Sequence, residues 1–296
     1  MRVFVTGATG FIGSAVVQDL LAAGHRVLGL ARSEEAAASL SAAGADVHRG
    51  SLDDLDSLRS GASATDGVIH TAFVHDFSDI AAAGETDRIA VGAIGAVLAG
   101  SDRPFVVTSG IAVLPQSRLG TENDAPDPRS AGKHRIASEE AALAMATQGV
   151  RASLVRLPPS VHGEGDHGFV PALIAIAREK GVSAYIGDGL NRWPAVHRLD
   201  AARLFRLALE KGSAGSRYHG IADRGIPVRE IAEVIGRRLN LPVVSKSSEE
   251  AAGHFGWLGH FFAGDYPASS SLTQERLGWR PAHPALLSDL DREGYF

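Results

Sequence analysis

Cysteine is absent from this chain of 296 residues. Its absence excludes disulfide bonds, thiolate metal sites, iron–sulfur clusters and a cysteine nucleophile. The chain therefore needs no oxidising compartment. Tyrosine is scarce as well, with 4 residues in the whole chain, so any chemistry that requires a tyrosine has only four positions from which to draw it.

The chain also lacks an excess of basic charge and a long apolar run. Lys and Arg number 29 against 34 Asp and Glu, a net charge of −5, which leaves no basic field to attract a phosphate backbone. No stretch of about 18 uninterrupted apolar residues occurs, and the first residues follow a strand pattern instead of a signal-peptide pattern. We therefore expect a cytoplasmic protein that acts on a small molecule and has neither nucleic acid nor membrane as a partner.

Short β-branched runs alternate with alanine-rich helical segments over the first two thirds of the chain. This alternation is typical of a parallel sheet covered by helices, and it predicts an α/β fold with a doubly wound sheet of the Rossmann type. The ligand crevice of such a sheet lies beyond the carboxyl ends of its strands. The expected strands are 2–6, 26–30, 45–48, 67–71, 104–108 and 151–156, and the expected helices are 13–23, 34–43, 53–60, 79–99 and 131–148.

The composition changes after about residue 157, where irregular stretches separate three further helical segments at 169–180, 200–211 and 228–239. We predict a dinucleotide-binding domain at 1–157, completed by returning segments near 181–200. Residues 158–296 would form a smaller substrate-binding lobe, and the two would pack as one unit. The aromatic stretch at 255–262 has three readings: a cover over the crevice, a contact in a homodimer, or a core helix of the smaller lobe.

A glycine-rich turn follows the first expected strand and opens the first helix. Gly7 permits a tight turn, Gly10 lets backbone N–H groups approach a pyrophosphate, and Gly13 lets the helix pack closely on the strand. The amino terminus of the helix adds unpaired N–H groups and the positive end of its dipole. A second strand ends roughly 20 residues later, as this motif requires. The turn is interpreted as a dinucleotide site, against the alternative of a glycine-rich turn without a ligand.

The residues at the end of the second strand bear on which dinucleotide binds. NAD enzymes place a carboxylate there to bind the ribose, whereas NADP enzymes place a cation beside the 2′-phosphate. This chain has Arg32 and Ser33 at that point and no acid. Both side chains offer donors suited to a phosphate, which favours NADP(H), although an arginine could also stack on the adenine of NAD.

Several motifs together resemble the extended short-chain dehydrogenase/reductase family, in its epimerase/dehydratase branch. They are TGATGFIG at 6–13, GSLDDLDSL at 50–58, VIHTA at 68–72, VVTSG at 106–110, RLPPSVHG at 156–163 and LGWRP at 277–281. The resemblance covers nearly the whole chain. Beside Gly7, Gly10 and Gly13, it implies cofactor contacts from Thr9, Phe11, Ile12, Arg32, Ser33, Ser51, Leu52, Thr71, Ala72, Phe73, Thr108, Arg135 and Pro158.

The family's usual catalytic pair, a tyrosine followed four residues later by a lysine, is missing. Tyr185, Tyr218 and Tyr266 are followed at that spacing by Gly189, Ala222 and Ser270, and Tyr295 lies too near the end of the chain. When the helical segment 135–140 is laid against the family's lysine-to-glutamate run, Arg135 takes the lysine position and Ala131 the tyrosine position.

These replacements change the chemistry that the site could perform. Alanine has no proton to give, and arginine stays protonated near neutral pH, so it cannot act as a general base. Arg135 can still bind the nicotinamide ribose or polarise a substrate carbonyl. Some atypical members of the family resemble this chain in carrying a His-x-x-x-Arg arrangement, but here His134 stands directly beside Arg135. Neighbouring residues on a helix point about 100° apart, so both are not expected to face the crevice squarely.

The candidate catalytic residues are Ser109, Arg135, His162 and His134. Ser109 matches the family's hydroxyl that binds the substrate carbonyl, with a turn-capping serine as its alternative. Histidine suits proton transfer because its pKa lies near 6.5. His162 follows the sixth strand, where the family often has an aromatic residue facing the pocket, whereas His134 is also consistent with a solvated surface position.

Three further groups have weaker signals. His167 lies in a glycine-rich loop with acidic neighbours at 163–168, but the spacing fits no metal site, and no metal is expected. His197 is expected to have a structural role just before Asp200, which would cap a helix beginning at Ala201. Arg192 and Trp193 could bind a carboxylate or phosphate of the substrate, or Trp193 could be an ordinary buried residue.

These observations favour an NADP(H)-dependent oxidoreductase that acts on a carbonyl or alcohol of a small molecule, with a non-standard catalytic site. Two alternatives remain open. One is a dinucleotide-binding sensor that retains the fold and has lost catalysis. The other is an atypical epimerase or dehydratase, although epimerisation by the usual route needs the missing tyrosine.

Overall fold

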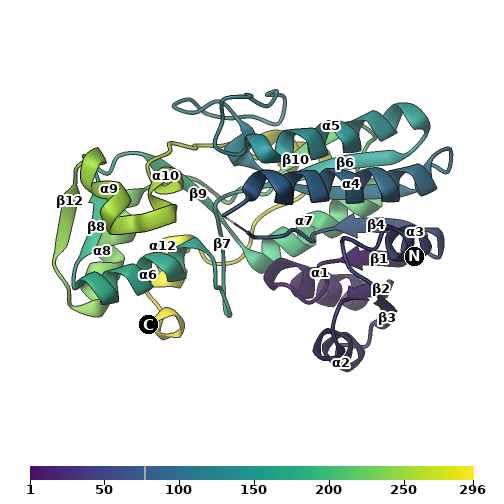
Figure 1. Cartoon of the computed structure of the whole chain (residues 1–296), viewed down its shortest axis with the longest axis horizontal. Helices are drawn as coiled ribbons and strands as arrows, with labels where there is room; N and C mark the ends of the chain where they lie inside the picture. Colours follow the sequence, from purple (N-terminus) through teal and green to yellow (C-terminus); the bar gives the residue numbers. More distant parts are fainter. Residues whose placement is uncertain (77) are drawn as a thin grey trace.

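The computed structural model describes residues 1–76 and 78–296, and within them seven parallel strands form one sheet (Figure 1). The strand order is β10-β6-β5-β4-β1-β2-β3. The chain starts at β1 inside the sheet and adds β2 and β3 on one side of it. It then adds β4, β5, β6 and β10 on the other side, so the order of the strands reverses between β1 and β4. This order places a crevice at the carboxyl ends of β1 and β4. The strands are β1 (Arg2–Thr6), β2 (Arg26–Ala31), β3 (Asp46–Arg49), β4 (Gly67–His70), β5 (Pro104–Gly110), β6 (Arg151–Leu157) and β10 (Ser216–His219).

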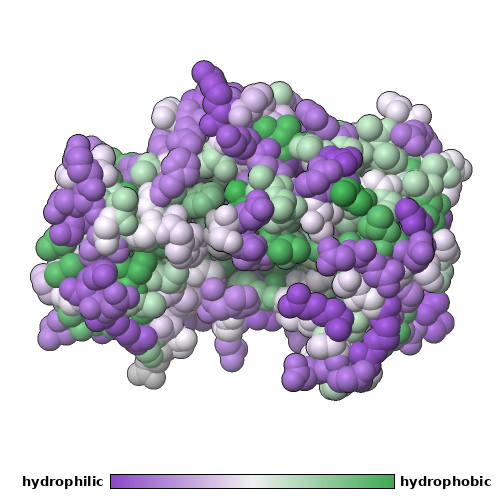
Figure 2. All heavy atoms as spheres, viewed as in Figure 1, coloured by the Kyte–Doolittle hydropathy of each residue, from purple (hydrophilic) through white to green (hydrophobic). Residues whose placement is uncertain are grey.

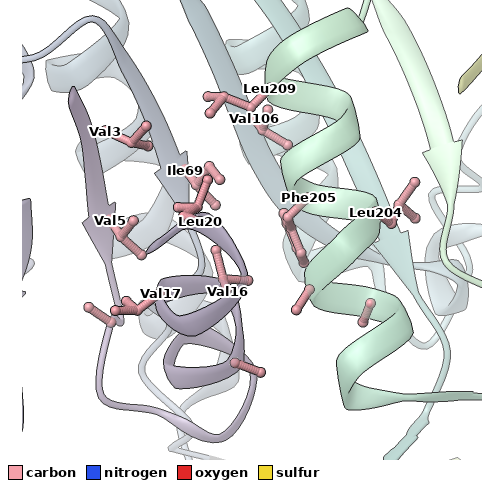
Figure 3. Close-up of a cluster of buried hydrophobic side chains, with 14 of the residues drawn as sticks. Val3, Val5, Val16, Val17, Leu20, Ile69, Val106, Leu204, Phe205 and Leu209 are labelled. Carbon is pink, nitrogen blue, oxygen red and sulfur yellow. The ribbon is translucent and has the colours of Figure 1, made fainter. Parts of the chain in front are cut away.

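Helices cover both faces of this sheet because its buried strands carry apolar side chains on alternate faces. Val3 and Val5 of β1 pack with α1 (Phe11–Ala22), α2 (Glu34–Ala42) and α7 (Arg198–Lys211), whereas Phe4 points to the opposite face. Figure 3 shows the first of these clusters, with side chains of α1 and α7 converging on the strands. The opposite face is covered by α3 (Leu55–Ser63), α4 (Ile80–Leu98) and α5 (Ile136–Ala144). The predicted doubly wound α/β fold is confirmed.

The smaller lobe lies to the left in Figure 1 and has a core of its own. A three-stranded sheet has the order β11-β9-β7, and β8 pairs with β12. Trp193, Ile231, Leu258 and Phe262 are among the fully buried residues of this core. The elements are β7 (Ser160–His162), α6 (Phe169–Lys180), β8 (Ser183–Ile186), β9 (Arg192–His197), β11 (Asp223–Pro227), α8 (Val228–Leu239), β12 (Val243–Lys246), α9 (Ser248–Phe255), α10 (Gly259–Phe262), α11 (Ser271–Leu277) and α12 (Leu286–Leu290).

The segment that returns to the large sheet differs from the expected one near 181–200. Strands β8 and β9 pair within the smaller sheets, and the chain re-enters the large sheet through α7 and β10. Strand β10 was not predicted because its four residues, SRYH, are mostly polar and it pairs only with β6 at the edge of the sheet. An edge strand of this kind lacks the continuous apolar run by which buried strands are recognised.

The helix expected at 131–148 is divided into three parts. A 3₁₀ turn at Lys133–Arg135 precedes α5, and another at Met145–Gln148 follows it. A buried ion pair holds α5 on β6, since Arg156 donates from Nε and Nη2 to the two carboxylate oxygens of Glu139 at 2.8 and 2.6 Å. Arg156 and Glu139 are 0% and 1% exposed. This pair fixes where α5 begins, and thereby where Arg135 lies.

The aromatic stretch at 255–262 is not one helix, because α9 and α10 are separated by a short 3₁₀ turn at Gly256–Leu258. Phe255, Leu258 and Phe262 belong to the core of the smaller lobe, and Trp257 is 49% exposed. Figure 2 shows hydrophilic residues spread over the visible face with hydrophobic ones in smaller groups among them. In the part of the chain that the structure describes, no helix has both the length and the apolar character needed to cross a membrane.

The edge strand β10 makes stability depend on pH. His219 is fully buried, and burial together with the nearby Arg156 lowers its pKa to about 3. An unfolded histidine takes up its proton near pH 6.5, so between about pH 6.5 and 3 the unfolded chain binds a proton that the folded chain does not. The free energy of unfolding should therefore fall as the pH drops below about 6.5, with His219 contributing up to about 1.4 kcal/mol per pH unit.

Urea unfolding between pH 7 and 5 measures this contribution. We expect His219→Asn, which keeps a donor toward the Ser269 carbonyl that His219 Nδ1 contacts at 2.9 Å, to show a shallower loss of stability than the wild type. His260→Asn, on an exposed position of α10, is the control for replacing a histidine and should keep the wild-type slope. Equal slopes in the wild type and His219→Asn would contradict the assignment.

Candidate active site

The glycine turn brings β1, the end of β4 and the start of α1 into very close contact. Gly7 has φ +66°, and a Cβ placed on it would lie 2.6 Å from the backbone nitrogen of Ala72. A Cβ on Gly13 would overlap the Gly7 carbonyl oxygen. L-residues other than glycine rarely adopt this φ, and neither position has room for a side chain. The expected roles of Gly7 and Gly13 thus follow directly from the packing.

Helix α1 begins at Phe11 with Gly10 as its N-cap. Glycine has no side chain with which to cap the first N–H groups, and the first turn contains no acidic residue. These N–H groups and the positive end of the helix dipole therefore favour an anion in front of the turn. An uncapped helix start directly after a tight glycine turn fits the pyrophosphate of a dinucleotide.

The ends of the neighbouring strands line the crevice beside this turn. Thr71 Oγ1 donates to the Thr6 carbonyl at 2.8 Å, and Thr108 Oγ1 donates to the His70 carbonyl at 2.7 Å. Both threonines are half-buried. These bonds tether the chain after β4, which carries Ala72 and Phe73, to the strands on either side. The structure thus brings together Thr71, Ala72 and Thr108 with the glycine turn, as expected.

Ser109 lies at the end of β5 and is 4% exposed. Its Oγ has no hydrogen-bond partner among the described residues, although buried polar groups are nearly always paired. Its strand neighbour on β6 is Arg156, two residues before the buried Pro158. A buried hydroxyl without a partner at the carboxyl edge of the sheet is suited to bind a polar atom of a ligand.

Arg135 lies flat on an aromatic ring and beside a carboxylate. Its guanidinium carbon is 3.7 Å from the centre of the Phe73 ring, and its Nη1 donates to Asp87 Oδ2 at 2.9 Å. The ring of His134 lies 5.9 Å from the same phenyl ring. Both residues therefore contact Phe73, although neighbouring residues on a helix point about 100° apart. The reason is that they precede α5 in a 3₁₀ turn, and one phenyl ring is wide enough to touch both.

His134 is half-buried and does not have the solvated position considered from the sequence. Burial and the neighbouring Arg135 lower its pKa to about 4. Its imidazole is therefore neutral at pH 7 and has no acidic proton ready to donate. His75, which lies in the loop after β4 and was not identified from the sequence, also has a lowered pKa because of burial and Arg135.

The residues expected at the adenosine end lie on the other side of the turn. Arg32 is exposed directly after β2, and Ser51 and Leu52 are half-buried after β3. Ser33 caps α2, since its Oγ accepts from the Ala36 nitrogen at 3.2 Å. Arg49, which sequence reasoning missed, donates from Nη1 to the Ser33 carbonyl at 2.9 Å and pairs with Glu34. Two arginines thus stand at the carboxyl ends of β2 and β3.

His162 is fully buried, and its Nδ1 lies 2.8 Å from Asp289 Oδ2 of α12. Its ring contacts that of His197 edge to face at 5.4 Å. These contacts place His162 with the carboxyl-terminal helix, whereas the Phe73 ring gathers Arg135 and His134. His197 is the N-cap of α7, with Nδ1 accepting from the Leu199 nitrogen at 3.3 Å. Helix α7 therefore begins at Arg198, three residues before the expected start.

Asp200 does not cap α7 and instead binds the carboxyl-terminal segment. It accepts from the backbone nitrogens of Ala282 and His283.

His167, in the loop after β7, contacts the Phe11 ring edge to face at 5.7 Å, and Arg198 lies 4.9 Å above the same ring. This loop therefore reaches the start of α1. The described residues include no group of three ligating side chains placed to hold a metal ion.

Arg192 is paired with a carboxylate, and Trp193 is buried. Arg192 donates from Nε and Nη2 to the two carboxylate oxygens of Asp265 at 3.0 and 2.9 Å. Trp193 is 0% exposed in the core of the smaller lobe. Of the two readings offered by the sequence, Trp193 is the ordinary buried residue, and the charge of Arg192 is already paired.

The comparison with known proteins agrees with this geometry. The sequence profile of the NAD dependent epimerase/dehydratase family matches residues 3–221. The chain belongs to this family. An uncharacterized protein of Schizosaccharomyces pombe is 57% identical over 298 residues, which span 100% of both chains.

Two further proteins are similar to this chain. A 4-hydroxy-2-methyl-3-oxo-4-farnesyl-3,4-dihydroquinoline-1-oxide ketoreductase of Stigmatella aurantiaca is 28% identical over 269 residues, covering 86% of this chain and 80% of the ketoreductase. A dTDP-glucose 4,6-dehydratase of Streptomyces venezuelae, solved with NAD and TYD bound, has a TM-score of 0.80 at 23% identity and covers 99% of this chain and 96% of that one. The second likeness concerns the fold.

The geometry of the glycine turn predicts the effect of a single methyl group. A Cβ on Gly10 would lie 3.3 Å from the Gly7 carbonyl oxygen, a tight but tolerable contact, and would stand before the uncapped N–H groups. We expect Gly10→Ala to fold and to bind a dinucleotide at least about tenfold more weakly, a loss of about 1.4 kcal/mol.

Titration with NADPH and NADH, followed by nucleotide fluorescence, measures the affinity. The matched control is Gly92→Ala in α4, where a Cβ would meet nothing within 4 Å. That control should keep the wild-type affinity and gain up to about 1 kcal/mol of stability, because alanine favours the helix. An unchanged affinity in Gly10→Ala would argue against a phosphate site at this turn.

Proposed function

We propose that this member of the family is an NADP(H)-dependent oxidoreductase that acts on a carbonyl or alcohol of a small molecule. The observation that carries the proposal is the buried, unpartnered hydroxyl of Ser109 at the crevice edge of β5. A hydroxyl in this state suits a substrate oxygen that it would meet only when a ligand is bound. The ketoreductase from Stigmatella aurantiaca supports a reductase reaction within the family.

Each part of the site has a role in this reaction. The dinucleotide, when bound, supplies or accepts the hydride. The turn from Gly7 to Gly13 would hold its pyrophosphate, and Ser109 would donate a hydrogen bond to the carbonyl oxygen. The guanidinium of Arg135 stays protonated and would stabilise the negative charge that develops on that oxygen.

The proton that accompanies the hydride would come from water. Ala131 stands where the family resemblance places the tyrosine, and it has no proton to give. His134 is neutral at pH 7 because its pKa is lowered to about 4, so it is suited to accept a hydrogen bond from that water. The site therefore relies on polarising the substrate oxygen, with no strong general acid.

The preference for NADP(H) follows from the charges beyond β2. No acidic side chain occupies the position of Arg32, and Arg49 lies beside Ser33 on the neighbouring strand. Arg49 also offsets the charge of Glu34, the nearest acid of α2. A 2′-phosphate would thus meet two guanidinium groups, whereas the ribose of NAD would find no carboxylate.

Reversing the charge at Arg32 tests this preference. We expect Arg32→Glu to weaken NADPH binding by at least about tenfold and to leave NADH binding equal or tighter, because a carboxylate repels the 2′-phosphate and accepts from the ribose. Arg26→Glu is the control, since Arg26 lies at the amino end of the same strand with a side chain that is 77% exposed. A wild type that binds NADH more tightly than NADPH would overturn the preference.

Loss of the Ser109 hydroxyl tests the reaction. We expect Ser109→Ala to lower the rate of NADPH oxidation by about 100-fold with aldehyde and ketone substrates, while NADPH affinity is retained. Ser153→Ala is the matched control, because Ser153 is 1% exposed and its Oγ is equally unpartnered, but it lies inside β6. That control should keep the wild-type rate.

The same assays separate this proposal from its alternatives. Tight NADPH binding without turnover of any aldehyde, ketone or alcohol would favour a dinucleotide sensor. Conversion of a sugar nucleotide without net change in the dinucleotide would favour an epimerase or dehydratase. The absence of binding to either dinucleotide would overturn all three readings.

A further inference from the structure

Three buried polar side chains connect the glycine turn to Arg135. Thr6 Oγ1 lies 2.8 Å from His70 Nδ1, His70 Nε2 lies 3.0 Å from Asp87 Oδ1, and Arg135 Nη1 lies 2.9 Å from Asp87 Oδ2. Thr6, His70 and Asp87 are each at most 1% exposed. We call Thr6, His70, Asp87 and Arg135 the polar chain. Its residues come from β1, β4, α4 and the turn before α5.

The direction of these hydrogen bonds follows from their two ends. At one end the backbone N–H of Ala72 can only donate, and it reaches Thr6 Oγ1 at 3.4 Å. Thr6 Oγ1 and His70 Nδ1 share the next hydrogen bond, and His70 Nε2 donates to Asp87, because a carboxylate can only accept. At the other end the Asp87 carboxylate accepts from His70 and from Arg135. Each member of the polar chain is therefore hydrogen-bonded to the next.

The charge of Asp87 is maintained by its partners. Burial raises the pKa of a carboxyl group, but Arg135 and the hydrogen bond from His70 outweigh burial and bring the pKa of Asp87 to about 2. A buried carboxylate is costly unless it is paired and hydrogen-bonded. Asp87 is thus bound on one side by the imidazole of His70 and on the other by the guanidinium of Arg135.

The packing also holds the backbone of the turn that carries Arg135. A Cβ on Gly84 of α4 would overlap the His134 carbonyl oxygen, so only glycine lets this turn approach α4 closely enough for Asp87 to reach Arg135. Phe73 covers one face of the guanidinium. Each side-chain nitrogen of Arg135 is either hydrogen-bonded or partly exposed. The side chain as a whole is 14% exposed. The N–H groups not used by Asp87 therefore face the solvent side.

We propose that Asp87 is a positioning residue that holds the guanidinium of Arg135 flat on Phe73, and that His70 and Thr6 orient Asp87. The role of Arg135 toward the substrate rests on the function proposed above, but the arrangement itself exists without a ligand. Asp87 uses one Nη group of Arg135 and leaves its other donors for the crevice. An arginine at this position needs such an anchor because its side chain is long and has several rotatable bonds.

A measurement without ligand tests the anchor directly. In the ¹H–¹⁵N spectrum of arginine side chains, the Arg135 signal, identified by its loss in Arg135→Lys, should show slow rotation of the guanidinium in the wild type. Asp87→Asn should abolish this restriction, because the amide places a donor where the carboxylate accepts. Asp265→Asn is the matched control, since it removes the carboxylate of the Arg192 pair in the smaller lobe, and it should leave the Arg135 signal unchanged.

Two variants of His70 keep the test decisive if Asp87→Asn fails to fold. His70→Gln retains an amide donor toward Asp87, so it should preserve most of the restriction. Methionine in His70→Met has a similar size but no donor. This variant should therefore speed the rotation of the Arg135 guanidinium, although Asp87 is still present to pair with it. An Arg135 signal that is equally restricted in the wild type, Asp87→Asn and His70→Met would overturn the proposal.

A double-mutant cycle then asks whether Asp87 acts through Arg135 during turnover. We expect Asp87→Asn and Arg135→Ala each to lower kcat/KM by about 10- to 100-fold, and the double variant to be no worse than Arg135→Ala alone. Added guanidinium ion should restore part of the rate of Arg135→Ala, but not that of the double variant, because the anchor is then missing.

The two parts of the experiment separate the two proposals. The positioning role would be overturned if the losses of kcat/KM in Asp87→Asn and Arg135→Ala multiplied in the double variant. It would also be overturned if added guanidinium ion restored the rate equally in Arg135→Ala and in the double variant. A wild type that turns over no substrate would refute the proposed function alone, because the side-chain spectrum still decides whether Asp87 and His70 hold Arg135.

Discussion

The close approach of the first helix to the turn after β1 is the constraint on which the site depends. Any side chain on Gly13 would overlap the carbonyl of Gly7, and any on Gly7 would collide with Ala72. The same contact therefore sets the position of the first N–H groups of α1 and of the chain after β4. Because Thr6 binds both Ala72 and His70, the polar residues beneath the crevice are placed by this contact as well.

The site differs from the family resemblance in how it can treat a substrate oxygen. A tyrosine beside a lysine would exchange a proton, whereas Ala131 and Arg135 cannot do so. Arg135 is instead held by Asp87 and Phe73, and His134 is kept neutral by burial and by the same guanidinium. In the function proposed above, the charge of Arg135 and the hydroxyl of Ser109 would polarise the substrate oxygen, and no substitute acid would be required.

Much of the sheet could be predicted because its strands and turns have local signals. Short β-branched runs between alanine-rich helical segments marked the first six strands, and the three glycines after β1 marked the turn. Edge strand β10 had no such signal, since its residues are polar. The ion pair of Arg192 could not be predicted because its partner Asp265 lies 73 residues away, and His70 looked like one more residue of a buried strand. Asp87 and Gly84 were missed because, in an alanine- and glycine-rich helix, nothing local shows which face meets the turn before α5.

The sequence by itself determined the class of the sheet, the glycine turn and the absence of a tyrosine with a lysine four residues on. Each of these depends on residue types at short spacings, which act through local conformation and sterics. The tertiary structure alone decided that Arg135 meets Asp87 and Phe73, that Ser109 lacks a partner and that His162 turns toward Asp289. The paired residues lie from 48 positions apart, as for Asp87 and Arg135, to 127 apart, as for His162 and Asp289, and only the packing of helices on the sheet brings them together.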